Sequence, residues 1–381
     1  MTSPGPQRSI LVVTVVHHPQ DARIRHREID ALLRAGWRVT YAAPFSGHGL
    51  AVPEPEGGLR CVDLPRSAGR RRLRALGHAR RTIRELGPRN DVVLIHDPEL
   101  LLATGRQRNV VWDVHEDTAA AVGAKEWLPR AVQRAAAAVL RSVERWAERR
   151  MPLLLAEYAY QERFRRRHPV VPNVVSVPRA MPPPGADRVV YLGSITLERG
   201  AEDVVALART LTDRTAGELQ THVIGPAHGA AEALIAAAHD EGVLQWHGFV
   251  PNEEALTMLD GALAGLSLLR DVPNYRHSMP TKVLEYMAHG VPVVTTPLPV
   301  ARDVVERSGC GVLVPFADPD AAAAAVLALR ADPSRAARLG RAGHAAVLRD
   351  YDWSSAGEQF VATMATLADP ARRAGGATAV R

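Results

Sequence analysis

Short apolar runs alternate with helical patterns along the first half of the chain. The runs occupy residues 10–16, 38–43, 60–64, 91–96, 110–114 and 153–156. Runs without alternating polar positions are typical of parallel strands that are buried on both faces of a sheet. Amphipathic patterns such as 21–35 and 131–149 separate some of the runs, and this alternation of strand and helix predicts a doubly wound α/β domain.

The alternation breaks at residues 168–185, which contain six prolines and no helical period. Such a segment is typical of a linker. Beyond it strand-like runs resume, at residues 188–192, 221–224, 245–249, 265–269, 291–295 and 311–314. We predict two Rossmann-like domains, over 1–170 and 188–354, joined by a proline-rich linker over 171–187. Because ligands bind at the carboxyl ends of strands in such domains, two facing domains would create a cleft for them.

The positive charge of the chain is carried almost wholly by arginine. The formal net charge is +6, and of 47 basic residues only Lys125 and Lys282 are lysines. A basic protein can bind nucleic acid or an anionic membrane. No zinc-finger spacing or RNA-binding aromatic pattern accompanies the arginines, so we expect no nucleic-acid partner.

Residues 66–84 hold eight arginines and no acidic residue. This run is either a peripheral membrane contact or a solvated helix face. Its apolar stripe is thin, since it consists of Leu73, Leu76 and Ile83. The thin stripe favours the solvated helix face.

Cys61 and Cys310 are the only cysteines and lie far apart, which is typical of free thiols in a reducing compartment. The apolar run near the N-terminus is too short for a signal peptide, and no run approaches the ~20 apolar residues of a membrane span. We expect a cytoplasmic protein, with peripheral attachment at the inner face of the membrane as the alternative. No HExxH or similar spacing predicts a metal site, and we expect neither a metal ion nor an organic cofactor.

The strongest chemical signal lies in residues 278–294, which read SMPTKVLEYMAHGVPVV. Pro280 is expected in the first turn of a short helix, and Gly290 ends that helix before a buried strand. Lys282 and Glu285 are three positions apart, so they share one helix face. Free N–H groups at a helix start bind anions, which would suit a diphosphate beside Lys282 and ribose hydroxyls on Glu285. The alternative is a surface ion pair between the two side chains.

This segment resembles the donor-binding helix of glycosyltransferase family 4. The matching positions are Pro280, Lys282, Glu285, Tyr286, Met287, Ala288, Gly290, Pro292 and Val293. The resemblance implies the GT-B fold and transfer of a sugar from a UDP- or GDP-sugar to an acceptor hydroxyl, with retention of configuration and without a metal ion. It also implies a final helix within 355–381 that returns to the first domain.

The resemblance assigns roles around this helix. Lys282 would act in catalysis and Glu285 would bind the ribose. Family members often carry an acidic residue eight positions before the one matched by Glu285, and this chain has His277 there. Further donor-site positions are His277, Ser278, Pro280 and Thr281.

A second match lies at residues 190–194 and 198–200, where a strand ends in a glycine turn before the next helix. Alone, such a turn is weak evidence, but it gains weight beside residues 278–294. The family commonly holds the pyrophosphate with two basic residues here. In this chain Ser194, after Gly193, replaces the first, and Arg199 keeps the second.

Three further regions supply candidates. Phe249, within 247–250, resembles the loop that contacts the base. His115 matches the position that faces the donor sugar, so the candidates for catalysis are His115, Arg199 and Lys282. Asp21 either contacts the acceptor or caps the following helix. The acceptor-side candidates at the ends of predicted strands are His18, Asp21, Asp97 and Glu116.

Three functions fit these residues. The favoured one is a glycosyltransferase that acts on a small-molecule, lipid-linked or glycan acceptor, in the synthesis of a polysaccharide, a glycolipid or a secondary metabolite. A nucleotide-sugar epimerase of the same fold would need a pair of carboxylates at the sugar, and His277 speaks against it. A non-catalytic nucleotide-sugar-binding partner subunit is the third, and the replacements at Ser194 and His277 keep it open.

Overall fold

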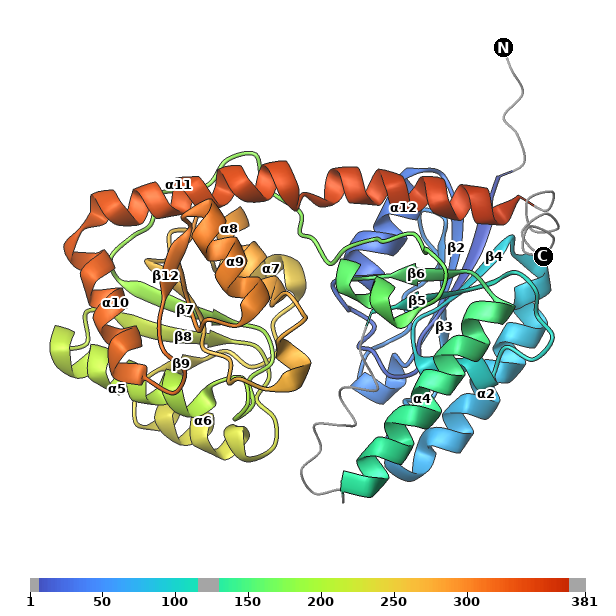
Figure 1. Ribbon diagram of the computed structural model, residues 1–381, viewed down its shortest axis with the longest axis horizontal. Coiled ribbons are helices and arrows are strands. Elements are labelled where there is room, and N and C mark those ends of the chain that lie inside the picture. Colours follow the sequence, from blue (N-terminus) through green and yellow to red (C-terminus); the bar gives the residue numbers. More distant parts are fainter. Residues whose placement is uncertain (1–6, 116–129, 370–381) are drawn as a thin grey trace, which may run out of the picture. The chain divides into compact units, whose positions relative to one another are not determined.

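The computed structural model describes residues 7–115 and 130–369, which form two compact units (Figure 1). The first unit comprises the described residues up to Asn173 together with those from Ser354 onward, and the second comprises Val174–Trp353. Each unit contains a six-stranded parallel sheet flanked by helices. No helix in the described ranges is long and apolar enough to span a membrane.

The sheet of the first unit has the strand order β3-β2-β1-β4-β5-β6. Its strands are β1 (Ser9–Val13), β2 (Arg38–Ala43), β3 (Leu59–Asp63), β4 (Val92–Ile95), β5 (Val110–Val114) and β6 (Leu153–Leu155). The helices are α1 (Asp30–Arg34), α2 (Arg72–Leu86), α4 (Arg130–Arg150) and α12 (Trp353–Ala368). Shorter helical segments are η1 (Ile24–Ile29), η2 (Ser46–His48), η3 (Gly69–Arg71), η4 (Gly87–Arg89), η5 (Pro98–Leu102) and η6 (Tyr158–Arg163).

One face of this sheet is covered by α2, η5 and α4. Ala79 of α2, Leu100 of η5 and Ala147 of α4 belong to a single core cluster with apolar side chains of β1, β4 and β5. The last helix, α12, is amphipathic. It buries side chains that are spaced four positions apart: Ala356, Phe360, Met364 and Ala368. From Ser354 onward this helix belongs to the first unit.

The sheet of the second unit has the order β12-β11-β10-β7-β8-β9. Its strands are β7 (Arg188–Leu192), β8 (Gln220–Ile224), β9 (Gln245–Trp246), β10 (Ala264–Ser267), β11 (Val293–Thr295) and β12 (Gly311–Leu313). The helices are α5 (Ala201–Thr215), α6 (Ala230–Asp240), α7 (Asn252–Thr257), η7 (Pro273–Tyr275), α8 (Thr281–Ala288), α9 (Pro299–Ser308), α10 (Pro319–Ala331) and α11 (Pro333–Asp350). One core cluster lies against α5, α6 and α10, and another lies against α7, α8 and α9.

Every apolar run that predicts a strand forms one, but several ends differ. β1 stops at Val13 because the amides of Val15 and Val16 donate to the carboxylate of Asp97 instead of to a neighbouring strand. β9 is shorter than predicted because Gly248 adopts φ +63°. The helix predicted over 21–35 begins only at Ile24, as the π-helical segment η1, and continues as α1.

Candidate functional site

Glycine turns line the carboxyl ends of β7, β8 and β9. Gly193 has φ +92°, and its N–H donates to the carbonyl oxygen of Ile224 at 2.7 Å. Gly225 lies so close that a Cβ there would stand 2.4 Å from the carbonyl oxygen of Gly193, and Gly225 in turn pairs with Gly248. Backbone rather than side chains therefore lines this edge, where ligands of such sheets bind.

Tyr286 fixes α8 against the same sheet. Its hydroxyl donates to the carbonyl oxygen of Leu266 at 3.0 Å and accepts from the amide of Leu192 at 2.8 Å. Only glycine fits at Gly265, since a Cβ there would lie 2.3 Å from the Tyr286 ring. α8 begins at Thr281, so Pro280 precedes the helix instead of occupying its first turn as predicted. The first amides of the helix, those of Thr281 and Lys282, have no preceding carbonyl in the helix to bond.

Lys282 is half-buried, with its Nζ atom fully buried. It makes no ion pair with Glu285 among the described interactions, so the surface ion pair is not formed. Its Nζ lies 3.4 Å from the centroid of the Tyr191 ring and has no hydrogen-bond acceptor within the described chain. Burial, and secondly the neighbouring Arg199, lowers the pKa of Lys282 well below its ordinary value, while Glu285 opposes this effect. Arg199 donates to the carbonyl oxygen of Ser194 at 3.2 Å. The described ion pairs include no partner for either cation, so this site attracts an anion.

The other predicted donor residues surround α8 and the glycine turns to different degrees. Glu285 is buried on α8. Ser278 and Thr281 are half-buried, and His277 is exposed. Phe249 exposes 52% of its surface just beyond the β9 end.

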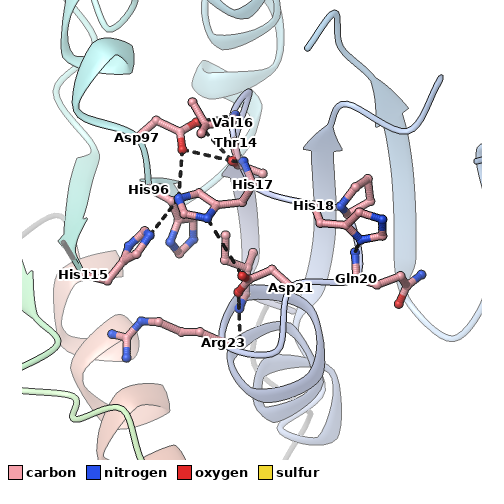
Figure 2. Close-up of polar contacts among 12 residues, drawn as sticks. Thr14, Val16, His17, His18, Gln20, Asp21, Arg23, His96, Asp97 and His115 are labelled. Atoms are coloured by element: carbon pink, nitrogen blue, oxygen red, sulfur yellow. Dashed lines mark hydrogen bonds and ion pairs between the residues drawn. The ribbon is translucent and has the colours of Figure 1, made fainter. Parts of the chain in front are cut away.

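The first unit holds a second cluster of polar side chains at the carboxyl ends of β1, β4 and β5 (Figure 2). Asp97 is buried and accepts hydrogen bonds from Thr14 and from the amide of Val15. Nε2 of His17 lies 3.3 Å from Oδ1 of Asp97 and 2.8 Å from Nε2 of His115. Asp97 therefore supports His17 and does not present a free carboxylate to an acceptor.

Asp113 links His115 to a deeper group of charges. Its Oδ2 lies 3.3 Å from Nδ1 of His115 and 3.2 Å from Nδ1 of His96, and Arg23 binds both of its oxygens at 2.8 Å. Burial alone would raise the pKa of Asp113, but Arg23 and the two histidines hold it well below its ordinary value. Burial and Asp113 raise the pKa of Glu28 to about 8, although Arg23, whose Nε lies 3.0 Å from Oε1 of Glu28, opposes this shift.

His96, Asp113 and His115 offer ligand atoms within 4.8 Å of one another, a grouping that can hold a metal ion. Arg23, however, already occupies both carboxylate oxygens and supplies the compensating positive charge. A divalent cation would stand beside a buried guanidinium, and like charges in a buried site repel strongly. The residues fit a closed network of ion pairs better than a metal site.

Of the remaining acceptor-side candidates, Asp21 joins this network, since its Oδ2 lies 3.9 Å from Nδ1 of His17 (Figure 2). His18 points away from His17 (Figure 2), stacks edge-on with His48 and accepts from the amide of Gln20 at 3.1 Å. Asp21 accepts from the amides of Arg23 and Ile24 at the start of η1, the geometry of a helix cap. Glu116 lies outside the described residues.

Sequence reasoning did not single out several residues that complete these sites. They are His17, Arg23, Glu28, Asp113 and Tyr191. One signal was available, since Asp113 interrupts the otherwise apolar run 110–114, and a buried charge needs a partner. Arg23 and Glu28 carry no such signal, because charged residues are common in surface helices.

Two parallel α/β units of this kind define the GT-B fold of glycosyltransferases, and solved structures agree. The structure resembles sucrose-phosphate synthase from Thermosynechococcus elongatus with a TM-score of 0.73 at 18% identity, over 95% of this chain and 99% of that one. It also resembles Alr3699/HepE from Anabaena, solved in complex with UDP and glucose, with a TM-score of 0.66 at 14% identity over 95% of this chain and 100% of that one.

Residues 180–345, within the second unit, match the family Glycosyl transferases group 1. The D-inositol 3-phosphate glycosyltransferase of Xylanimonas cellulosilytica is 32% identical over 189 residues, which are 48% of this chain and 44% of that protein. The glycogen synthase of Mycobacterium tuberculosis is 27% identical over 177 residues, 46% of this chain and 41% of that protein. The chain thus spans less than half the length of these curated relatives. The solved structures confirm the predicted GT-B fold.

Proposed function

We propose that the protein transfers a sugar from a UDP- or GDP-sugar to an acceptor hydroxyl. The observation that carries the proposal is the pair of half-buried cations beside the start of α8, Lys282 and Arg199, which have no carboxylate partner among the described ion pairs. A diphosphate supplies the charge that such a site lacks, and the first amides of α8 add donors for it. The Anabaena neighbour was solved with UDP and glucose, which supports a uridine donor.

In the proposed reaction, the bond between the anomeric carbon and the diphosphate oxygen breaks, and the electron pair leaves with that oxygen. Lys282, Arg199 and the amides of α8 stabilise the negative charge that develops there. The acceptor oxygen bonds to the anomeric carbon on the same face, and its proton passes to the departing phosphate oxygen. No side-chain nucleophile and no metal ion take part. Glu285 binds the ribose hydroxyls of the donor.

We assign the imidazoles of His17 and His115 to hydrogen bonds with sugar hydroxyls, which would replace the 2.8 Å contact between their Nε2 atoms. His115 is fixed by Asp113, and His17 is fixed by Asp97, so both rings are held in one orientation. His17 retains 16% side-chain exposure and His115 retains 10%, whereas the carboxylates behind them have none. The rings are therefore the accessible ends of a rigid network.

The test is a thermal-shift series with UDP, GDP and ADP, followed by donor hydrolysis and transfer assays. A ligand at a hundred times its dissociation constant stabilises the folded state by about 2.7 kcal/mol. We expect UDP or GDP to stabilise the wild type and not Lys282→Ala, with the exposed Arg338→Ala as the matched control. A protein that binds the diphosphate but neither hydrolyses nor transfers any sugar would be a non-catalytic partner subunit.

A further inference from the structure

Exposed apolar side chains gather on the helical layer of the first unit that is formed by α2, η5 and α4. Ten large hydrophobic side chains of the described residues are exposed, and half of them lie on this layer: Leu73, Leu102, Val132, Val139 and Trp146. Single exposed hydrophobic residues are ordinary, but their concentration on one face marks an interaction surface. We call these side chains and the arginines around them the α2–α4 surface.

The solvent-exposed surface of α4 has an apolar stripe and, next to it, a row of arginines. Val132, Val139 and Trp146 are seven positions apart, so they form one stripe of about 21 Å along the helix. On the opposite margin Glu148 is buried and binds the amide of Arg165 at 2.9 Å, beyond β6. The helical period places exposed arginines between that margin and the stripe, namely Arg134, Arg141, Arg145 and Arg149.

The segment of the chain that contains this helical layer, residues 66–150, is strongly basic. Residues 66–150 contain 18 of the 47 basic residues but only 10 of the 41 acidic ones, so they carry the whole positive excess of the chain. Both glutamates of α4, Glu144 and Glu148, are buried. On η3 and α2 the exposed acidic residue is Glu85, against seven exposed arginines: Arg70, Arg71, Arg72, Arg74, Arg80, Arg81 and Arg84.

We propose that the α2–α4 surface docks the protein onto an anionic lipid bilayer. Guanidinium groups bind phosphate oxygens in pairs, and the exposed aliphatic and indole groups enter the interface beneath the headgroups. A nucleic acid or an acidic protein would engage the arginines but would leave Leu73, Val139 and Trp146 without a role. The sequence alone favoured a solvated face for 66–84, because its apolar stripe of Leu73, Leu76 and Ile83 is thin. Leu76 and Ile83 pack against the core of the first unit, and α4 supplies the exposed stripe.

The test is flotation of the full chain with vesicles of phosphatidylcholine alone and of phosphatidylcholine mixed with phosphatidylglycerol. We expect binding to the mixed vesicles only, weakening as salt is added. Arg141→Gln with Arg145→Gln should weaken binding roughly thirtyfold, and Val139→Ser with Trp146→Ser should weaken it at least about tenfold. The matched controls in the second unit, Arg338→Gln with Arg341→Gln and Leu348→Ser, should bind as the wild type does.

Circular dichroism and thermal midpoints establish that each variant is folded. Equal binding to both vesicle types would overturn the proposal. So would binding that survives Val139→Ser with Trp146→Ser, because the stripe would then have no part in docking. Binding of a duplex DNA oligonucleotide, but not of mixed vesicles, with sensitivity to the α4 arginines would replace the bilayer by a nucleic acid. The outcome is independent of sugar transfer, since no donor-site residue is altered.

Discussion

Lys282→Met should change the stability of the fold and the activity of the proposed donor site in opposite directions. Methionine has nearly the same length as lysine but no charge, and it can pack against the Tyr191 ring. A buried polar group without a partner costs about 1–3 kcal/mol, whereas the contact between Nζ and the Tyr191 ring returns about 0.5–2 kcal/mol. We expect the ligand-free variant to gain about 1 kcal/mol in free energy of unfolding, or about 2–4 °C in thermal midpoint.

This gain in free energy of unfolding should depend on pH, and the lowered pKa of Lys282 determines the direction. The unfolded chain binds this proton more tightly than the folded protein does, so wild-type stability rises with pH between the lowered pKa and 10.5. The slope is at most about 1.4 kcal/mol per pH unit. The advantage of Lys282→Met should therefore shrink as the pH rises through that window. Urea unfolding of both proteins across the alkaline range measures this difference.

Activity should change in the opposite sense. Loss of a preorganised charge at the leaving group typically lowers turnover on the order of a hundred- to a thousandfold, so Lys282→Met and Lys282→Ala should be nearly inactive. Lys282→Arg should also be impaired, because a planar guanidinium does not replace a compact ammonium at a confined phosphate. If Lys282→Met lost stability without ligand but kept wild-type turnover, Lys282 would be a structural residue and the donor-site reasoning would be refuted.

Four further outcomes are expected. Glu28→Gln should flatten the pH dependence of unfolding: with its folded pKa raised to about 8, Glu28 contributes stability at low pH that is lost as the pH rises through 8, and urea titrations at several pH values would show whether that loss disappears. Asp113→Asn should lower the free energy of unfolding by up to about 3–5 kcal/mol, because the buried Arg23 loses the carboxylate that binds it through both oxygens and keeps only Glu28, at 3.0 Å; an unchanged melting curve would contradict the ion-pair network. Glu285→Ala should abolish the thermal shift given by a nucleoside diphosphate while the ligand-free thermal midpoint changes little. Transfer should survive excess EDTA, and strict dependence on magnesium or manganese would rule out charge neutralisation by Lys282 and Arg199 alone.

The sequence predicted the positions of the strands far better than it predicted which groups surround each charged side chain. Apolar runs without polar alternation are sufficient to locate buried parallel strands, since burial on both faces leaves no position for a polar residue. The predicted strand ends were wrong where a distant side chain accepts hydrogen bonds from the backbone amides, as Asp97 does beyond Val13. No local pattern reports such a contact.

In the donor site, too, local geometry could be predicted from the sequence but the surroundings of a charged residue could not. The spacing of Lys282 and Glu285 and the flanking glycines could be read directly, because they follow from helix and turn geometry. The burial of Lys282 could not, since it depends on Tyr191, ninety-one positions earlier in the chain, whose ring lies beneath Nζ. In the first unit Arg23 meets Asp113 only when β1 and β5 stand in one sheet. Pairings at that separation are set by topology and not by sequence spacing.

The return of α12 to the first unit has a consequence for synthesis of the protein. The second unit is one uninterrupted stretch, Val174–Trp353, and can finish folding as soon as that stretch has been made. The first unit begins earlier but waits for Phe360 and Met364, which are fully buried and among the last described residues. A chain that stalls or is cut near Trp353 would therefore expose apolar surface at the opposite end of the sequence, on the unit that was translated first. The nascent N-terminal half is the part that most needs a chaperone.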